Sequence, residues 1–265
     1  MGPRVTVGVS LKMYFGHRSA IEWCRSVRQL AEAHPAVSGG SVGLFVIPSF
    51  VAIAPAVAEL AGSPVLVGAQ DLFSEDRGAF TGEVSGAELA EVGARVVEVG
   101  HAERRRLFGE TDDVVAAKTA AALRNGLTPV LCIGEAAHSG AADAVAECER
   151  QLSSALADAP DGAVIVAYEP VWAIGAERPA EAVYIRAVTA ELRRVVAGLP
   201  GRDGSAVIYG GSAGPGLLTE LGDDVDGLFL GRFAHDPAAL GAVLDEAAAL
   251  AEARSGEHAA AGRAR

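Results

Sequence analysis

The chain has 265 residues, half of them hydrophobic, so it is long enough to bury a substantial core. Its 34 acidic residues outnumber its 22 lysines and arginines and give a net charge of −12. This balance argues against nucleic acid or an anionic membrane surface as a partner, although a locally positive site can still bind a small anionic ligand. The sequence also lacks the apolar run of about eighteen residues that a membrane span requires.

The three cysteines of the chain are Cys24, Cys132 and Cys148, and no two of them form a CxxC pair. This sparse set argues against a disulfide framework and against a zinc site. The N-terminal segment does not resemble a signal peptide, because a short strand-like run begins almost at once. We therefore expect a cytoplasmic protein.

Eight short apolar runs are typical of strands that are buried on both faces of a parallel sheet. They cover residues 5–9, 42–47, 65–69, 96–99, 129–133, 164–167, 206–209 and 227–230. The segments between them have the mixed faces of surface helices, most clearly at 113–124, 141–156 and 183–199. Ser19 and Ser85 each precede a glutamate by three positions, which is the spacing of a helix capping box.

This alternation predicts a protein of the α/β class, with a single (β/α)8 barrel over residues 1–254. The alternative is an open, doubly wound sheet, but the sequence lacks the GxGxxG and GxxxxGK[ST] motifs that would support nucleotide binding there. From residue 255 to 265 the apolar periodicity is lost, and we expect a mobile C-terminal tail.

Candidate catalytic and substrate-binding side chains follow three of the predicted strands, at the end where such barrels place their active sites. Ser10 and Lys12 follow the first strand, His101 and Glu103 follow the fourth, and Glu169 follows the sixth. Each alone has an ordinary explanation, since a glutamate before a proline is usually a solvated turn residue. A cation, an imidazole and a carboxylate at one barrel mouth together indicate a catalytic site.

Two glycine-rich turns suggest a phosphate site beside these residues. Gly210, Gly211 and Ser212 follow the seventh predicted strand, and Gly231 and Arg232 follow the eighth. Exposed backbone N–H groups at such turns bind oxyanions, and barrels of this kind often bind phosphate after strands seven and eight. The alternative is that the glycines only relieve tight turns. The histidines show no metal-ligand spacing, so we expect no metal.

These residues lie in segments that resemble the motifs of triosephosphate isomerases. The segments are KM at 12–13, AFTGE at 79–83, GHAERR at 100–105, CIGE at 132–135, YEPVWAIG at 168–175 and YGGS at 209–212. The resemblance runs from residue 5 to about residue 250, and YEPVWAIG is a highly specific part of it. It implies a TIM barrel and an isomerase that interconverts aldose and ketose phosphates without a cofactor.

Such an isomerase removes a proton from the carbon next to a carbonyl and returns it one carbon away. By resemblance, Glu169 is the base, while Lys12 and His101 donate hydrogen bonds to the oxygen of the enediolate. In this family the histidine acts as a neutral ring at a helix N-terminus. Glu103 would pair with Lys12 and hold its ammonium group in place.

The same resemblance implies a lid and a second subunit. Residues 170–180 would form the lid, whose closure brings the Gly175 N–H onto the phosphate of the substrate and excludes water. Thr81 lies at the tip of a loop that in this family reaches into the active site of a neighbouring subunit. The resemblance therefore implies a homodimer.

Four places depart from the usual family pattern. Ser10 stands where the family usually has asparagine, and the shorter side chain should enlarge the pocket and weaken the usual contact to Thr81 of a partner subunit. Ala102 stands where the family commonly has serine. Residues 176–179 lack the usual hinge glycine, and Arg232 replaces a glycine of the phosphate site. Because the catalytic residue types remain while their surroundings differ, we predict the same proton transfer on a longer substrate.

The predicted substrate is a tetrulose phosphate such as an erythrulose phosphate. The alternative within the family is triosephosphate isomerase proper, which interconverts dihydroxyacetone phosphate and glyceraldehyde 3-phosphate in glycolysis and gluconeogenesis. The alternative from another class is a barrel that binds a phosphorylated ligand without turning it over.

Overall fold

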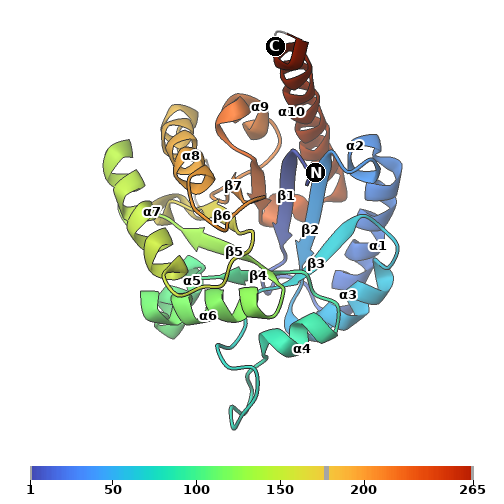
Figure 1. The fold of residues 1–265 in the computed structure, drawn as a ribbon. Helices are drawn as coiled ribbons and strands as arrows, with labels where there is room; N and C mark the ends of the chain where they lie inside the picture. Colours follow the sequence, from blue (N-terminus) through green and yellow to red (C-terminus); the bar gives the residue numbers. More distant parts are fainter. Residues whose placement is uncertain (1, 176–178, 264–265) are drawn as a thin grey trace.

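In the computed structural model, which describes residues 2–175 and 179–263, eight parallel strands close into one barrel in the order of the chain (Figure 1). The strands are β1 (Val5–Ser10), β2 (Val42–Ile47), β3 (Val65–Ala69), β4 (Val96–Val99), β5 (Thr128–Ile133), β6 (Ile165–Tyr168), β7 (Ala206–Tyr209) and β8 (Gly227–Leu230). The predicted (β/α)8 barrel is confirmed, and the open doubly wound sheet is excluded by the pairing of β1 with β8.

The predicted strands lie within one residue of the observed ones at each end. The agreement has a physical cause, because each strand is covered by helices outside and by other side chains inside. All six residues of β1 are buried, for example, and such a strand can be recognised as a continuous apolar run.

Helices surround the barrel (Figure 1). The α-helices are α1 (His17–Ala33), α2 (Pro35–Ser38), α3 (Ile53–Glu59), α4 (Gly86–Glu91), α5 (Ala102–Phe108), α6 (Asp112–Arg124), α7 (Ala141–Leu156), α8 (Ala182–Ala197), α9 (Leu217–Leu221) and α10 (Pro237–Arg263). Short 3-10 helices are η1 (Phe50–Ala52), η2 (Val171–Ala173), η3 (Gly222–Asp224) and η4 (Arg232–His235).

The two predicted capping boxes have different outcomes. Ser85 is the N-cap of α4, and its hydroxyl accepts a hydrogen bond from the backbone N–H of Glu88. The prediction at Ser19 is wrong, because α1 begins earlier, at His17, after the extended residue Gly16. Ser19 therefore lies inside the helix, where the N–H group three residues later can already bond to a backbone carbonyl of the preceding turn and needs no cap.

Helix α10 extends into the segment for which the sequence predicts a mobile tail. No break in the backbone marks residue 255, since α10 continues to Arg263. Alanine is the commonest residue of this stretch and has the highest helix propensity, so the loss of an apolar stripe did not mean the loss of the helix. The mobility expected for residues 255–265 stays a prediction.

Side chains fill the inside of the barrel below its carboxyl end. This inner cluster consists of Phe45, Ile47, Val96, Val130, Cys132, Ala167, Ile208 and Phe229. Gly8 is needed there, because a Cβ atom on it would lie 2.1 Å from the Cζ of Phe45. The rings of Phe45 and Phe229 lie 5.8 Å apart, so any cavity at the carboxyl end has a closed floor.

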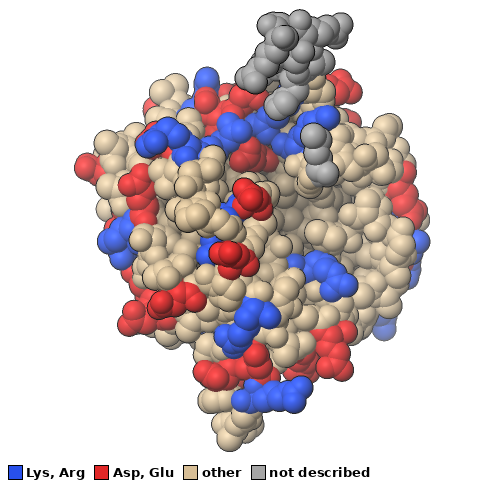
Figure 2. Space-filling model, viewed as in Figure 1, with Lys and Arg blue, Asp and Glu red and all other residues tan. Residues whose placement is uncertain are grey.

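Acidic and basic side chains are interspersed over the face of the molecule in Figure 2. That face carries no continuous basic surface of the kind that binds nucleic acid. Among the described helices, none is both long enough and apolar enough to cross a membrane.

Candidate active site

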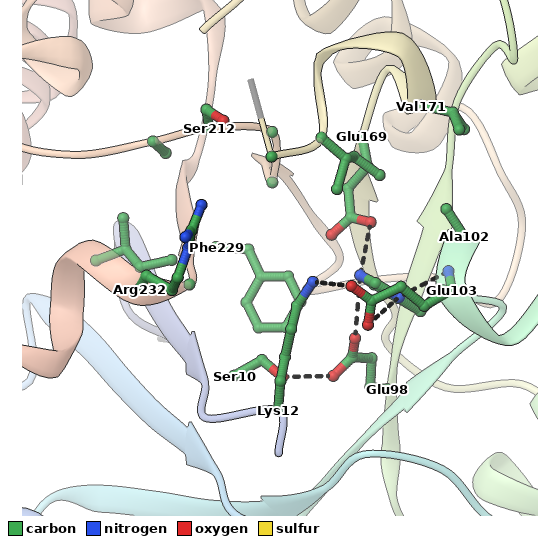
Figure 3. A pocket seen from close by; sticks show the side chains of 18 of the residues that line it. Ser10, Lys12, Glu98, Ala102, Glu103, Glu169, Val171, Ser212, Phe229 and Arg232 are labelled. Carbon is green, nitrogen blue, oxygen red and sulfur yellow. Dashed lines mark hydrogen bonds and ion pairs between the residues drawn. The ribbon is translucent and has the colours of Figure 1, made fainter. Parts of the chain in front are cut away.

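A cavity of about 660 Å³ opens at the carboxyl ends of the strands. It is lined by every predicted catalytic and substrate-binding residue: Ser10, Lys12, His101, Glu103, Glu169, Gly175, Gly210, Gly211, Ser212, Gly231 and Arg232. Barrel closure thus brings together residues that are up to 222 positions apart in the sequence, as the resemblance implied. Figure 3 shows the polar side chains converging on this cavity.

Lys12 lies two residues after the end of β1 and extends its ammonium group into the cavity. Its φ angle is 46°, and among the described residues no other non-glycine has a positive φ. The Gln70 amide, which donates to the carbonyl of Lys12 at 2.9 Å, helps to hold this strained backbone. Burial opposes the charge of Lys12, but the hydrogen bond from its Nζ to Glu103 Oε1, at 2.9 Å, and the nearby carboxylates raise its pKa. The Lys12 side chain is therefore positively charged near pH 7.

His101 is the N-cap of α5, so its ring lies where backbone N–H groups are unsatisfied. Its Nδ1 accepts a hydrogen bond from the Glu103 N–H at 3.1 Å. A neutral ring that accepts at Nδ1 carries its proton at Nε2. Burial and the charge of Lys12 lower the pKa of His101 to about 4, so the ring is neutral near pH 7. The Nε2–H is thus a hydrogen-bond donor at the cavity.

Glu169 follows β6 and is only 3% exposed. Its Oε2 lies 3.6 Å from His101 Nε2 and has no hydrogen-bond partner among the described residues. Burial, together with the charge of Glu98, raises its pKa well above the usual range of a carboxyl group. An acceptor oxygen that is buried and unpaired in this way is poised to take a proton from a ligand.

Gly134 and Gly210 make room for Glu169. A Cβ atom on Gly210 would lie 2.7 Å from Glu169 Oε1, and one on Gly134 would lie 2.1 Å from the Glu169 carbonyl oxygen. The glycine that we assigned to the phosphate turn therefore also has a packing role beside the candidate base.

Sequence reasoning missed Glu98, which lies on β4 and lines the same cavity. Its side chain is 4% exposed, and the Ser10 hydroxyl donates to its Oε2 at 3.0 Å. Burial raises the pKa of Glu98 to about 7, against the opposing charge of Lys12 and the hydrogen bond from Ser10. The available signal was a single carboxylate in a strand that is otherwise valine.

The glycine turns and Arg232 form the opposite side of the cavity. Gly175 is exposed and has a φ of 75°, and the Ser212 hydroxyl donates to the carbonyl of Ala173 at 3.3 Å. The guanidinium of Arg232 borders the cavity, with its Cζ 5.9 Å from the centre of the Tyr14 ring. The Arg232 side chain therefore lies at the cavity.

Part of the predicted lid is held by a buried carboxylate. Glu135 Oε1 accepts hydrogen bonds from Trp172 Nε1 at 2.7 Å and from the Tyr184 hydroxyl at 2.8 Å. Trp172 belongs to η2, so this bond fixes the first half of the segment. The hinge residues 176–178 lie outside the described residues.

Thr81 is the one predicted site residue that does not line this cavity. It is exposed in the loop between β3 and α4, which projects away from the barrel (Figure 1). Among the described residues, no group of three or more histidine, cysteine or carboxylate side chains is arranged to hold a metal ion.

Comparisons with known proteins point to the same family as the sequence motifs. The triosephosphate isomerase family model matches residues 5–247. The chain is 55% identical to an L-erythrulose-1-phosphate isomerase of Pectobacterium atrosepticum, covering 93% of this chain and 97% of the relative. It is 43% identical to a triosephosphate isomerase of Symbiobacterium thermophilum, covering 85% and 91%.

A solved structure shows the same arrangement. The triosephosphate isomerase of Bartonella henselae has a TM-score of 0.78 and 28% identity to this chain, covering 92% of this chain and 98% of the other. The chain therefore belongs to the triosephosphate isomerase family and is an isomerase of a small phosphorylated sugar.

Proposed function

We propose that the preferred substrate is a four-carbon ketose phosphate, L-erythrulose 1-phosphate. The observation that carries the proposal is the 55% identity to a relative named for this substrate, over nearly the whole length of both chains. Ser10, where the family usually has asparagine, supports it from the site, because a shorter side chain leaves room for a longer substrate.

Glu169 acts as the base in this proposal. Its unpaired Oε2 takes the proton from the carbon beside the carbonyl, on the side away from the phosphate, and returns it to the former carbonyl carbon. The pKa of Glu169, raised by burial, makes its carboxylate a stronger base toward a carbon-bound proton than an exposed glutamate would be.

Lys12 and His101 stabilise the enediolate that forms between these steps. The negative charge develops on an oxygen that the Lys12 ammonium and the His101 Nε2–H can reach as preorganised donors. Glu103 accepts from Lys12 and donates its N–H to His101, so it positions both groups.

The phosphate binds at the turns on the other side of the cavity. Backbone N–H groups of Gly211, Ser212 and Gly231 bind its oxygens, and Arg232 supplies a cation at the mouth. Closure of the lid adds the Gly175 N–H and excludes water, which protects the enediol phosphate from losing its phosphate.

The product of this reaction is a second ketose. In L-erythrulose 1-phosphate the carbonyl is at carbon 2, so loss of a proton from carbon 3 and its return to carbon 2 moves the carbonyl to carbon 3. Numbered from the other end, that compound is an erythrulose 4-phosphate. With a triose the same steps interconvert an aldose and a ketose, because the terminal carbon then bears a hydrogen.

The test is kcat/KM of the purified protein on L-erythrulose 1-phosphate and on glyceraldehyde 3-phosphate. We expect a value of about 10⁴ M⁻¹s⁻¹ or more with the former, and with the triose a value thousands of times below the diffusion limit of about 10⁸–10⁹ M⁻¹s⁻¹. A triose value near that limit would instead make this a triosephosphate isomerase proper, the activity for which the 43% identical relative is named. Turnover of neither substrate would favour the binding barrel.

We also infer a homodimer in the cytoplasm. The location is supported by the three cysteines, which are all buried and free of disulfides. The dimer is supported by exposed apolar side chains at one part of the carboxyl edge of the barrel, which include Met13, at 93% exposure, and Phe80, at 42%. Cell fractionation and native mass measurement test these two inferences.

A further inference from the structure

Glu98 is a carboxylate in a position that normally costs folding free energy. It lies in the strand Val96–Val99, and its neighbour in the alternating pattern, Val96, belongs to the inner cluster of the barrel. Its side chain therefore points inward, at the floor of the cavity. A buried carboxylate that is not fully paired is expensive, so its retention calls for a role.

The two oxygens of Glu98 differ in their contacts. Oε2 accepts the hydrogen bond from the Ser10 hydroxyl at 3.0 Å. Oε1 lies 3.8 Å from His101 Nε2, which is too far for a direct hydrogen bond. Among the described residues, the hydrogen-bond donors do not occupy all acceptor positions of Glu98, so its carboxylate can accept a further hydrogen bond from a ligand in the cavity.

Glu98 and Ser10 lie at the end of the cavity opposite the phosphate turns. In Figure 3, Ser212 lies above the Lys12 ammonium group, whereas Ser10 and Glu98 lie below it. A substrate held by its phosphate near Ser212, with its reacting carbons at Lys12, would direct its far end toward Ser10 and Glu98.

A four-carbon ketose phosphate differs from a triose phosphate at this far end. It carries one additional hydroxymethyl group, on the carbon that is terminal in the triose. We propose that Glu98, together with Ser10, binds the hydroxyl of this group and so determines the preference for the longer substrate. The proposal rests on the substrate proposed above.

The chemistry of the pair fits a hydroxyl ligand. A carboxylate accepts from a hydroxyl, and a hydrogen bond to a charged acceptor in a dry site is among the stronger ones. The Ser10 hydroxyl, shorter than an asparagine amide, leaves space for the added carbon and remains bound to Glu98 Oε2. A site built to bind a hydroxyl discriminates strongly against an analogue that lacks it.

The competing role is purely positional, since Glu98 also lies near His101. If it only oriented the imidazole, its loss would impair both substrates alike, because both pass through the same enediolate. The ratio of kcat/KM for L-erythrulose 1-phosphate to kcat/KM for glyceraldehyde 3-phosphate therefore separates the two roles.

The experiment measures this ratio at pH 8 for the wild type, Glu98→Leu, Glu98→Gln and Ser10→Asn. Leucine keeps the approximate size of the side chain and removes both acceptors, so we expect the ratio to fall at least tenfold. Glutamine keeps one acceptor oxygen, so its ratio should fall less. Asparagine at position 10 fills the added space, and its ratio should also fall. The matched control is Ser212→Ala, at the phosphate end, which should leave the ratio unchanged.

The outcomes distinguish the proposals. An unchanged ratio in Glu98→Leu, with both activities reduced equally, would overturn the specificity role. If the wild type itself does not turn over L-erythrulose 1-phosphate, the proposed substrate fails first, and it does so before any variant is compared. Binding of glycerol 3-phosphate, which has the phosphate but no carbonyl, checks that each variant keeps an intact phosphate end.

Discussion

Glu169 has one carboxyl oxygen in a setting that disfavours the folded state. Its Oε2 is buried without a hydrogen-bond partner among the described residues, and such an atom costs about 1–3 kcal/mol. The proposed reaction explains why the cost is retained, because an oxygen that is already satisfied by the protein is a weaker base toward a substrate.

Replacing Glu169 should lower the rate of the chemical step while leaving ligand affinity nearly unchanged. Glu169→Gln keeps the shape of the side chain but cannot accept a proton, so we expect kcat to fall on the order of 10³-fold or more. The affinity for glycerol 3-phosphate, measured by calorimetry, should change far less, because the phosphate turns are untouched. Turnover retained in the glutamine variant would contradict the assignment of Glu169 as the base.

The pKa of Glu98 predicts how stability depends on pH. In the unfolded chain this carboxyl releases its proton near pH 4.5, whereas in the folded protein burial raises its pKa to about 7. The folded state therefore binds more protons between these values, and the contribution of Glu98 to the free energy of unfolding falls as pH rises through this range.

Glu98→Leu removes that dependence. We subtract the free energy of unfolding of the wild type from that of Glu98→Leu at each pH, both measured by urea denaturation. This difference should be larger at pH 8 than at pH 5, by on the order of 3 kcal/mol. Glu91→Leu, at an exposed position on α4, is the matched control. Parallel pH profiles for Glu98→Leu and the wild type would argue against a raised pKa.

At the scale of elements, the alternation of β4 and the start of α5 decide where the catalytic groups point. Val97 and Val99 pack beneath the helices, so Val96 and Glu98 face the inside of the barrel. The chain then passes Gly100, whose φ is 74°, and begins α5 with His101 as its N-cap. A strand and a short helix together therefore position a buried carboxylate and a neutral imidazole side by side.

Helix starts offer a test that is independent of catalysis. Ser85→Ala removes the hydroxyl that caps α4 and should lower the free energy of unfolding by about 1 kcal/mol. Ser19→Ala is the matched control, because Ser19 lies inside α1, and its effect should be below about 0.5 kcal/mol. Equal losses in urea denaturation would contradict the observed start of α1 at His17.

At the scale of the whole molecule, exposed apolar side chains occur in the segments that follow the first four strands. They are Met13 after β1, Phe50 and Val51 after β2, Phe80 after β3, and Leu107 and Phe108 after β4. Consecutive strands are neighbours in the barrel, so these side chains lie along one part of its carboxyl edge. Exposed apolar side chains along one edge are typical of a protein–protein interface, and they support the proposed dimer.

Disrupting the loop tip should separate the subunits. Phe80→Asp places a charge in the proposed interface, so we expect analytical ultracentrifugation to show a monomer and kcat to fall with it. Val183→Asp is the control, because Val183 is 77% exposed on α8, away from the first four strands, and it should leave the mass unchanged. A wild type that is already a monomer would refute the dimer.

The strands and most of the site were predictable from sequence because their signals are local. A strand buried on both faces is a continuous apolar run, and Lys12, His101 and Glu169 lie within two residues of the ends of such strands, in specific motifs. The start of α1 was not predictable in this way. Several residues near Ser19 are compatible with a helix start, and the packing of the whole helix selects among them.

The role of Glu98 could be seen only in the tertiary structure. In the sequence it is one carboxylate among valines, and nothing near it signals a partner, because Ser10 is 88 positions away. The same holds for Gly210, whose missing side chain leaves the space that Glu169 occupies. Local patterns determined which residues form strands and which polar groups end them. Barrel closure alone decided which of those groups face each other, since such contacts depend on distances that the chain order does not contain.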